Sequence, residues 1–230
     1  MKPFQAGDTA PVSEAQAHYL ANVMRVGLGD RLRAFDGVSG EFEAVVETVS
    51  RKGASLRIGA RTRAMEPPPD CWLCFALLKR QKTDLVVEKA TELGVARILP
   101  VITARTQADH VNLDRLRAIA IEAAEQCERV SVPEIGAPMS LETLMTGWPE
   151  RRLYVADERR TAAVLNSSSA GTGPRALLIG PEGGFTEAEL DGIAARPLVT
   201  RVSLGRRILR AETAAIAGLA LLLAGDPQEE

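Results

Sequence analysis

The C-terminal part of the chain reads Ala176-Leu-Leu-Ile-Gly-Pro-Glu-Gly-Gly-Phe185, an apolar segment that breaks into a glycine-rich turn. Beyond a short helix capped by Thr186, a second apolar segment at residues 199–203 breaks into Leu204-Gly-Arg-Arg-Ile-Leu-Arg210. Short apolar runs that end in glycine turns are typical of buried strands. Because ligands of parallel sheets bind beyond the carboxyl ends of the strands, we expect the two turns to form one ligand site.

The chain before these turns alternates between strand and helix patterns. The patterns predict strands over residues 71–78, 97–101, 153–156, 176–179 and 199–203, and helices over residues 83–93, 113–128 and 211–224, with a further helix opening at residue 186. This order is typical of an α/β domain with a mostly parallel sheet and helices on both faces.

Residues 1–66 are instead rich in β-strand patterns. Ser13 and Gln16 form a capping box that opens a short helix, and strands are predicted over residues 31–36, 42–50 and 55–63. Three prolines within residues 66–70 then form a stiff linker that can continue neither a helix nor a strand ladder. We therefore expect two domains, a small β-rich domain over residues 1–66 and the α/β domain over residues 70–230.

Composition excludes several classes of protein. The chain has 46% apolar and 25% charged residues, as ordinary globular proteins do, and its net charge of −2 excludes a globally basic nucleic-acid binder. Any nucleic acid would be contacted through local clusters of arginine and lysine. No apolar run reaches the roughly 20 residues of a membrane span, and the N-terminal residues lack an apolar h-region, so we expect no secretory signal. We expect a cytoplasmic protein with no membrane partner.

Cys71 and Cys74 form a C-x-x-C pair inside a predicted strand. Residues three apart in a strand point to opposite faces, so the two sulfurs would not converge on a metal ion. No second cysteine or histidine pair completes a zinc site. We expect both cysteines to be structural and expect no metal.

The first turn, at residues 180–184, is neither a Walker A loop nor a dinucleotide fingerprint. Its glycines allow close backbone approach to a ligand such as a purine edge or a ribose, although a simple strand-to-helix turn would use them too. The second turn carries arginines and no acid between residues 197 and 211. Clustered guanidinium groups suit phosphate or RNA, and a solvated basic turn is the alternative.

These two motifs together resemble the paired signature of the SPOUT-class methyltransferases, and more narrowly the family that methylates N3 of a uridine in 16S ribosomal RNA. Further matches to that family lie at residues 18–25, 35–37, 79–94 and 122–127, so the resemblance covers nearly the whole chain. It implies an N-terminal PUA-like barrel that binds RNA and a C-terminal SPOUT domain with a deep trefoil knot. It also implies a homodimer with the last helix in the interface, and 16S ribosomal RNA or the small ribosomal subunit as partner.

The resemblance further implies S-adenosyl-L-methionine as cofactor, bound largely through backbone groups. The expected cofactor-binding residues are Leu178, Gly180, Pro181, Glu182, Gly183, Gly184, Ser203, Leu204, Gly205, Ile208, Leu209 and Thr213.

Uracil N3 carries a proton, so the reaction needs a base or cationic groups that stabilise the developing anion. We expect Arg210 to steady the uracil or its phosphate and Glu212 to hold that arginine; structural roles for Glu182 and Glu212 are the alternative. The expected RNA contacts, each of which could instead be a solvated surface charge, are Arg25, Lys79, Arg80, Lys82, Arg129, Arg206 and Arg207. Two other functions stay open: methylation of a ribose 2′-hydroxyl by the same class of enzyme, and a noncatalytic RNA-binding factor.

Overall fold

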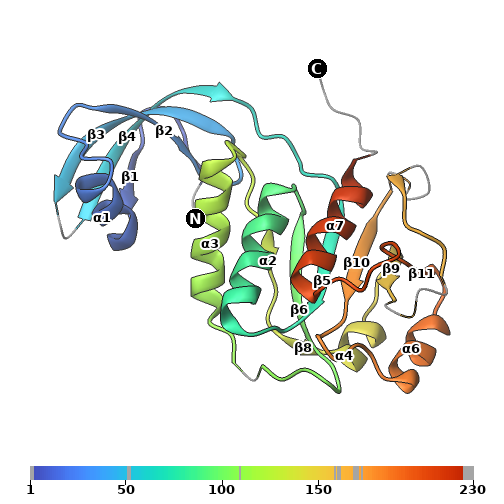
Figure 1. Ribbon diagram of the computed structural model, residues 1–230. Helices are drawn as coiled ribbons and strands as arrows, with labels where there is room; N and C mark the ends of the chain where they lie inside the picture. The colour runs from blue at the N-terminus through green and yellow to red at the C-terminus, as the bar shows by residue number, and fades with distance from the viewer. Residues whose placement is uncertain are drawn as a thin grey trace. The chain divides into compact units, whose positions relative to one another are not determined.

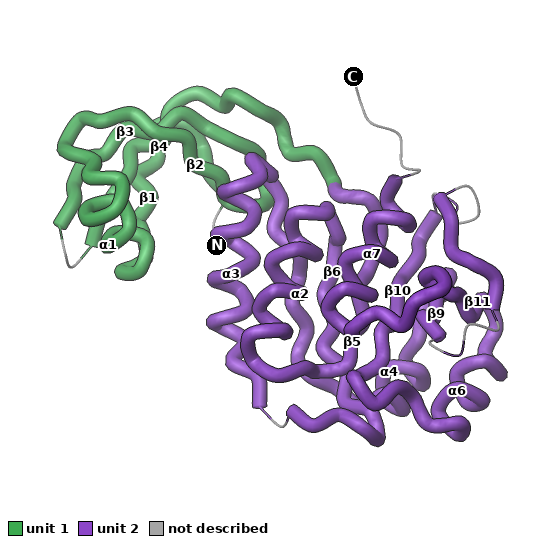
Figure 2. The backbone as a smooth tube through the Cα atoms, viewed as in Figure 1, with its two compact units in different colours: residues 1–67 green, residues 68–230 purple. Residues whose placement is uncertain are grey.

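The computed structural model describes residues 3–50, 53–108, 110–157, 159, 162–167, 171 and 173–224. The chain divides into two compact units, residues 1–67 and residues 68–230 (Figure 2). Among the described residues, no helix has the length and apolar character that a bilayer span needs.

The first unit is a small antiparallel β-domain with one helix. Its elements are β1 (Thr9–Val12), α1 (Glu14–Asn22), β2 (Arg31–Phe35), β3 (Glu41–Ser50) and β4 (Gly53–Arg63), with the strands in the order β1-β4-β3-β2. The predicted capping box is confirmed, because the Ser13 hydroxyl accepts from the Gln16 N–H while the Gln16 side chain accepts from the Ser13 N–H. Alternate residues of β3, including Phe42, Ala44 and Val46, are buried beneath the sheet, as the period-2 pattern requires.

The second unit is built on a parallel sheet of seven strands. They are β5 (Cys71–Ala76), β6 (Arg97–Ile102), β7 (Glu134–Ile135), β8 (Met139–Ser140), β9 (Arg152–Ala156), β10 (Arg175–Ile179) and β11 (Val199–Val202). Their order is β11-β9-β10-β5-β6-β7, with β8 also paired to β6, and every recorded pairing is parallel. The predicted parallel α/β architecture is confirmed.

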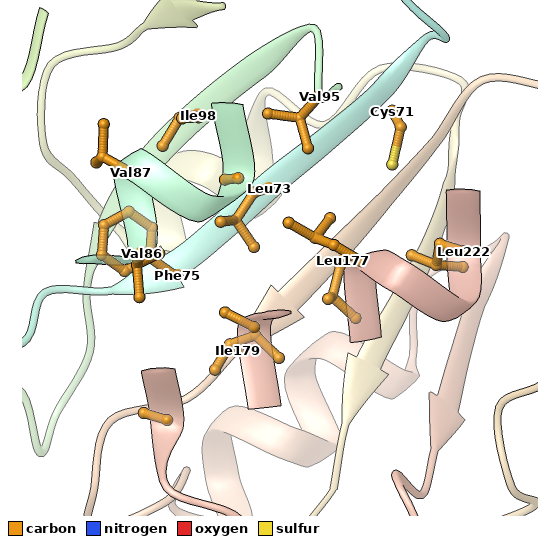
Figure 3. Packing of buried hydrophobic residues seen from close by; sticks show 14 of the residues in the cluster. Cys71, Leu73, Phe75, Val86, Val87, Val95, Ile98, Leu177, Ile179 and Leu222 are labelled. Carbon is orange, nitrogen blue, oxygen red and sulfur yellow. The ribbon is translucent and has the colours of Figure 1, made fainter. Parts of the chain in front are cut away.

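Helices cover both faces of this sheet (Figure 1). They are α2 (Arg80–Glu92), α3 (Leu113–Gln126) and α7 (Ala211–Leu223) on one face, and α4 (Leu141–Thr146) and α6 (Glu187–Ala194) on the other. Figure 3 shows the first of the two cores, where Leu73 and Leu177 of the sheet meet Val86 of α2 and Leu222 of α7.

The two cysteines of the C-x-x-C pair lie in different cores. Cys71 is buried on the face covered by α2, α3 and α7, whereas Cys74 is buried on the face covered by α4 and α6. Burial raises the pKa of the Cys74 thiol to about 12, so it stays protonated at neutral pH. Their opposite orientation confirms the expectation from strand alternation.

Some element bounds differ from the prediction. The α2 helix begins at Arg80 instead of residue 83, because the Thr83 hydroxyl donates to the Leu78 carbonyl from within the first turn and does not act as an N-cap. The short elements β1, β7, β8 and α4 were not predicted, since their few residues carry too little periodicity to recognise.

The chain lies on both sides of β11 near its carboxyl end. The Asp157 N–H donates to the Val202 carbonyl on the β9 side. The Ser203 N–H donates to Ala163, and the Leu165 N–H donates to the Ser203 carbonyl, on the opposite side. Asp157 and Ala163 therefore lie on opposite sides of this strand, as a knotted chain requires, and the knot itself stays a prediction.

Candidate functional site

A pocket of about 260 Å³ lies where β9, β10 and β11 end, close to the lower end of the range for small-molecule sites, about 300 Å³. Of the predicted cofactor residues, it is lined by Gly180, Pro181, Glu182, Gly184, Ser203, Leu204, Gly205, Ile208 and Leu209. Arg207 and Arg210 also line it, together with residues that were not predicted: Ala156, Asp157, Ile179, Ala211 and Ala214. Leu178, Gly183 and Thr213 are not in the lining. The structure thus brings the two glycine turns together, as expected from their positions after parallel strands.

The first turn is shaped by a buried phenylalanine. A Cβ added to Gly180 would lie 2.9 Å from the ring of Phe185, whose side chain is fully enclosed. Gly184 adopts a positive φ of 67°, and its N–H donates to the Pro181 carbonyl at 2.9 Å. Thr186 then caps α6 in the predicted capping box, which fixes the exit of the turn.

Arg105, which sequence reasoning missed, holds this turn from the loop after β6. Its Nη1 donates to the Gly183 carbonyl at 2.7 Å. In the same loop, the Ala104 N–H donates to Glu189 Oε1 at 2.8 Å. Arg105 follows the carboxyl end of a strand that lies near β10 in the sheet, so the rule that located the two turns could also have indicated it.

The second turn is closed by Ser203 and Gly205. The Ser203 hydroxyl accepts from the Gly205 N–H and donates to the Gly205 carbonyl, both at 3.2 Å, and Gly205 has a positive φ of 114°. Beside it lies Asp157, a buried carboxylate that pairs with Arg201 and accepts from the Arg159 N–H at 3.0 Å. Asp157 therefore has its charge compensated at the edge of the pocket.

A lysine of α2 lies between two carboxylates at the mouth of the pocket. Lys82 Nζ is 3.0 Å from Glu182 Oε1 and 3.6 Å from Glu212 Oε2. The hydrogen bond to Glu182 raises the pKa of Lys82. Burial tends to raise the pKa of Glu182, but its hydrogen bonds and the nearby lysines outweigh burial and lower it. Glu212 was expected to hold Arg210; its recorded ion pair is with Lys82, and Arg210 is exposed beside the pocket.

The other predicted RNA contacts are dispersed. Arg129 has a structural role. Its guanidinium donates hydrogen bonds to the Thr91 carbonyl at 2.6 Å, the Val95 carbonyl at 2.7 Å and the Ser131 hydroxyl at 2.9 Å. Burial lowers its pKa to about 10, so it stays charged while it holds these groups. The exposed predicted contacts are Arg25 in the first unit and Lys79, Arg80, Arg206 and Arg207 in the second.

No group of three or more potential metal ligands occurs among the described residues. The site therefore offers backbone groups, apolar side chains and exposed cations around one pocket. Such a site can bind an amphipathic small molecule and present it to an anionic polymer.

Comparisons with known proteins agree with this geometry. Residues 65–223 match the family model of an RNA methyltransferase domain, and residues 12–59 match that of an RNA methyltransferase PUA domain. The ribosomal RNA small subunit methyltransferase E of Rickettsia conorii is 35% identical over 90% of this chain and 86% of its own length.

Solved structures extend the similarity to the fold. A methyltransferase from Legionella pneumophila with bound S-adenosylmethionine has a TM-score of 0.88 at 30% identity, covering 97% of this chain and 94% of its own. The ribosomal RNA small subunit methyltransferase E of Neisseria gonorrhoeae, also with bound S-adenosylmethionine, has a TM-score of 0.82 at 28% identity over 95% and 92%. The chain therefore belongs to the small-subunit ribosomal RNA methyltransferase E family of SPOUT-class enzymes.

Proposed function

We propose that this protein uses S-adenosylmethionine to methylate N3 of a uridine in the 16S ribosomal RNA of the small subunit. Family membership and the names of the relatives support the reaction class and the ribosomal RNA. The bound S-adenosylmethionine of two similar structures supports the cofactor. The observation that carries the proposal is the joint pocket of the two glycine turns after β10 and β11.

The residues of this pocket fit the cofactor. Gly180, Gly184 and Gly205 leave the backbone bare where a ligand approaches. Ile179, Leu204, Ile208 and Leu209 add apolar surface suited to an adenine ring. A pocket of this kind binds mostly through backbone groups and shape.

When bound, the cofactor supplies an electrophilic methyl group on a sulfonium. The chain has to place the uracil ring in line with that group, which is mainly a matter of positioning. Arg210 is the N-cap of α7 and lies in the pocket lining, so its guanidinium and the helix N-terminus both offer positive charge there. We propose that the N3 proton is lost to solvent water and that Arg210 stabilises the negative charge that develops on the uracil as that proton leaves. Glu212 is left out of this step, because it is buried against Lys82 and not in the lining.

Exposed cations of each unit are the proposed contacts to RNA phosphates. In the second unit they are Lys79 and Arg80 at the start of α2, together with Arg206 and Arg207. In the first unit Arg25 is the proposed contact, in keeping with the match to a PUA domain. Because each phosphate contact releases counterions, RNA affinity should fall steeply with salt.

We also propose a homodimer through α7. Its inner face is buried, whereas Thr213 and Ala220 are exposed and Ile216 and Ala217 are only partly covered. This apolar outer face fits a second copy of the chain, as the family resemblance implies. A molar mass of one chain by light scattering at micromolar concentration would contradict it.

The experiment compares wild type with Arg210→Ala and with Arg196→Ala, a matched loss of an exposed arginine just beyond the end of α6. Small subunits that lack the modification are incubated with labelled S-adenosylmethionine, and the nucleosides are then separated by mass spectrometry. We expect 3-methyluridine from wild type and Arg196→Ala, and a turnover reduced on the order of 100-fold for Arg210→Ala.

Each other outcome has a defined meaning. A parental rate for Arg210→Ala would remove the role of that arginine. A 2′-O-methylated nucleoside would contradict the N3 position while keeping the enzyme class. If calorimetry detected no binding of S-adenosylmethionine, the protein would be a noncatalytic RNA-binding factor.

A further inference from the structure

Lys82 connects two parts of the pocket that are far apart in the sequence. It extends from the first turn of α2, which packs beside α7 (Figure 1). Its ammonium donates to Glu182 of the first glycine turn at 3.0 Å and lies 3.6 Å from Glu212, at the start of α7. The second glycine turn leads directly into α7, so Lys82 bridges the ends of both turns.

Burial makes this bridge a strong constraint at its Glu212 end. The Glu212 residue is 9% exposed, and its Oε2 accepts no hydrogen bond in the described part of the chain. The cation recorded beside that oxygen is Lys82. Removing Lys82 would leave this largely buried carboxylate without its neighbouring cation, so the contact ties the start of α7 to α2.

The charges at this position argue against a phosphate contact. One ammonium lies between two carboxylates, which gives the three side chains a net charge of −1. A phosphate would therefore have to compete with two carboxylates for this ammonium, whereas the neighbouring cations Lys79 and Arg210 are exposed. Lys79, at the same end of α2, is exposed and forms no ion pair with the residues that the structure describes.

We infer that Lys82 is a positioning residue that holds the two glycine turns in the geometry for cofactor binding, and that it does not contact RNA. The inference rests on the proposed function, since it names S-adenosylmethionine as the ligand of the pocket. Both partners of Lys82 are close to that ligand's site: Glu182 lines the pocket, and Glu212 follows Ala211, which lines it too.

The test uses Lys82→Met and Lys82→Arg, with Lys79→Met as the same substitution one helical turn away. Calorimetry with S-adenosylmethionine and filter binding with a small-subunit ribosomal RNA transcript give the two affinities. Loss of a charge-assisted hydrogen bond corresponds to about a ten-fold weaker binding. We expect Lys82→Met to bind the cofactor about ten-fold more weakly than wild type and Lys82→Arg to recover part of that affinity. Both variants should bind RNA as wild type does. For Lys79→Met we expect the opposite pattern, with RNA affinity reduced and cofactor affinity kept.

Hydrogen exchange provides a readout without any ligand. Amides of residues 180–186 should exchange faster in Lys82→Met than in wild type, because the turn loses its tie to α2. If Lys82→Met unfolds through its unpaired carboxylate, the double variant Lys82→Met/Glu212→Gln removes that charge and keeps the test available. Because both substitutions remove the same ion pair, the double variant should bind the cofactor no more weakly than Lys82→Met alone.

Two results would overturn the inference. One is a Lys82→Met protein with unchanged cofactor affinity and unchanged exchange in residues 180–186. The other is a Lys82→Met protein in which RNA affinity falls as it does in Lys79→Met. A wild-type protein that fails to bind S-adenosylmethionine would instead contradict the proposed function, so the two failures are distinguishable.

Discussion

Gly180 has no room for a side chain, so replacing it with alanine tests whether the shape of the first turn determines cofactor binding. The added Cβ would lie 2.9, 3.1 and 3.3 Å from three carbons of the Phe185 ring. Normal carbon contacts are about 3.5 to 4.0 Å. The ring is 1% exposed and packed among residues of the sheet and α6, so it cannot move aside without disturbing that core.

Overpacking of this kind costs about 1 to 3 kcal/mol. If the strain stays in the core, the free energy of unfolding falls by that amount. If the turn shifts to relieve the strain, the same free energy appears as a loss of cofactor affinity of roughly 5- to 150-fold. The prediction for Gly180→Ala is therefore that the two losses together account for about 1 to 3 kcal/mol.

Urea unfolding and calorimetry with S-adenosylmethionine measure the two parts. Gly192→Ala is the matched control, because Gly192 is an exposed residue of α6 and nothing lies within 4 Å of its added Cβ. The control should gain about 1 kcal/mol from helix propensity and bind the cofactor normally. A Gly180→Ala protein with parental stability and parental affinity would refute the argument that the Phe185 ring shapes the turn.

Three further changes test how the site is supported. Arg105→Met removes the donor to the Gly183 carbonyl and should weaken cofactor binding about ten-fold in calorimetry; unchanged affinity would contradict this role. Burial raises the pKa of Glu189, but hydrogen bonds from Ala104 and Thr186 outweigh it and place the pKa below 4.5. The ionised Glu189 carboxylate should therefore stabilise the fold above pH 4.5, and this contribution should be lost as the pH falls further. In Glu189→Gln the melting temperature should decrease less on acidification than in wild type. An equal decrease in the two proteins would contradict this role of Glu189. Gly218→Val places a Cβ 2.6 Å from the Leu177 side chain and should lower the free energy of unfolding, measured in urea, by about 1 to 3 kcal/mol. Parental stability would instead mean that α7 can shift away from β10.

The features that sequence predicted best are those determined by nearby residues. Ser13 and Thr186 cap helices through partners three residues away, so the capping boxes could be read directly. The glycine turns are likewise continuous segments, and their position after apolar strands was enough to place them at one end of a parallel sheet. The alternation of Cys71 and Cys74 between two faces followed from strand geometry alone.

The features that sequence missed depend on residues far apart in the chain. Lys82 and Glu182 are 100 positions apart, and Arg105 is 78 positions from Gly183. Periodicity shows which elements form, but not which side chain of one helix reaches which loop. Lys82 therefore looked like one more surface cation near the site, and its two carboxylate partners appeared only with the fold.

Arg129 is the reverse case, a residue predicted to contact RNA that instead binds other parts of the fold. Its position after a long helix suggested an exposed contact, whereas its guanidinium is partly buried and donates to carbonyls at the end of α2. A charged residue can serve the fold when carbonyls that lack helix partners need donors. Nothing in the local sequence marks those carbonyls.

We propose that this protein places a methyl group on N3 of a uridine in 16S ribosomal RNA. The most direct test is mass mapping of 16S ribosomal RNA from a strain that lacks the gene, from the same strain complemented with wild type, and from one complemented with Arg210→Ala. We expect one 3-methyluridine to be lost on deletion, to return with wild type and to stay low with Arg210→Ala. A 16S ribosomal RNA that keeps its 3-methyluridine after deletion, or that loses a different methyl group, would contradict it.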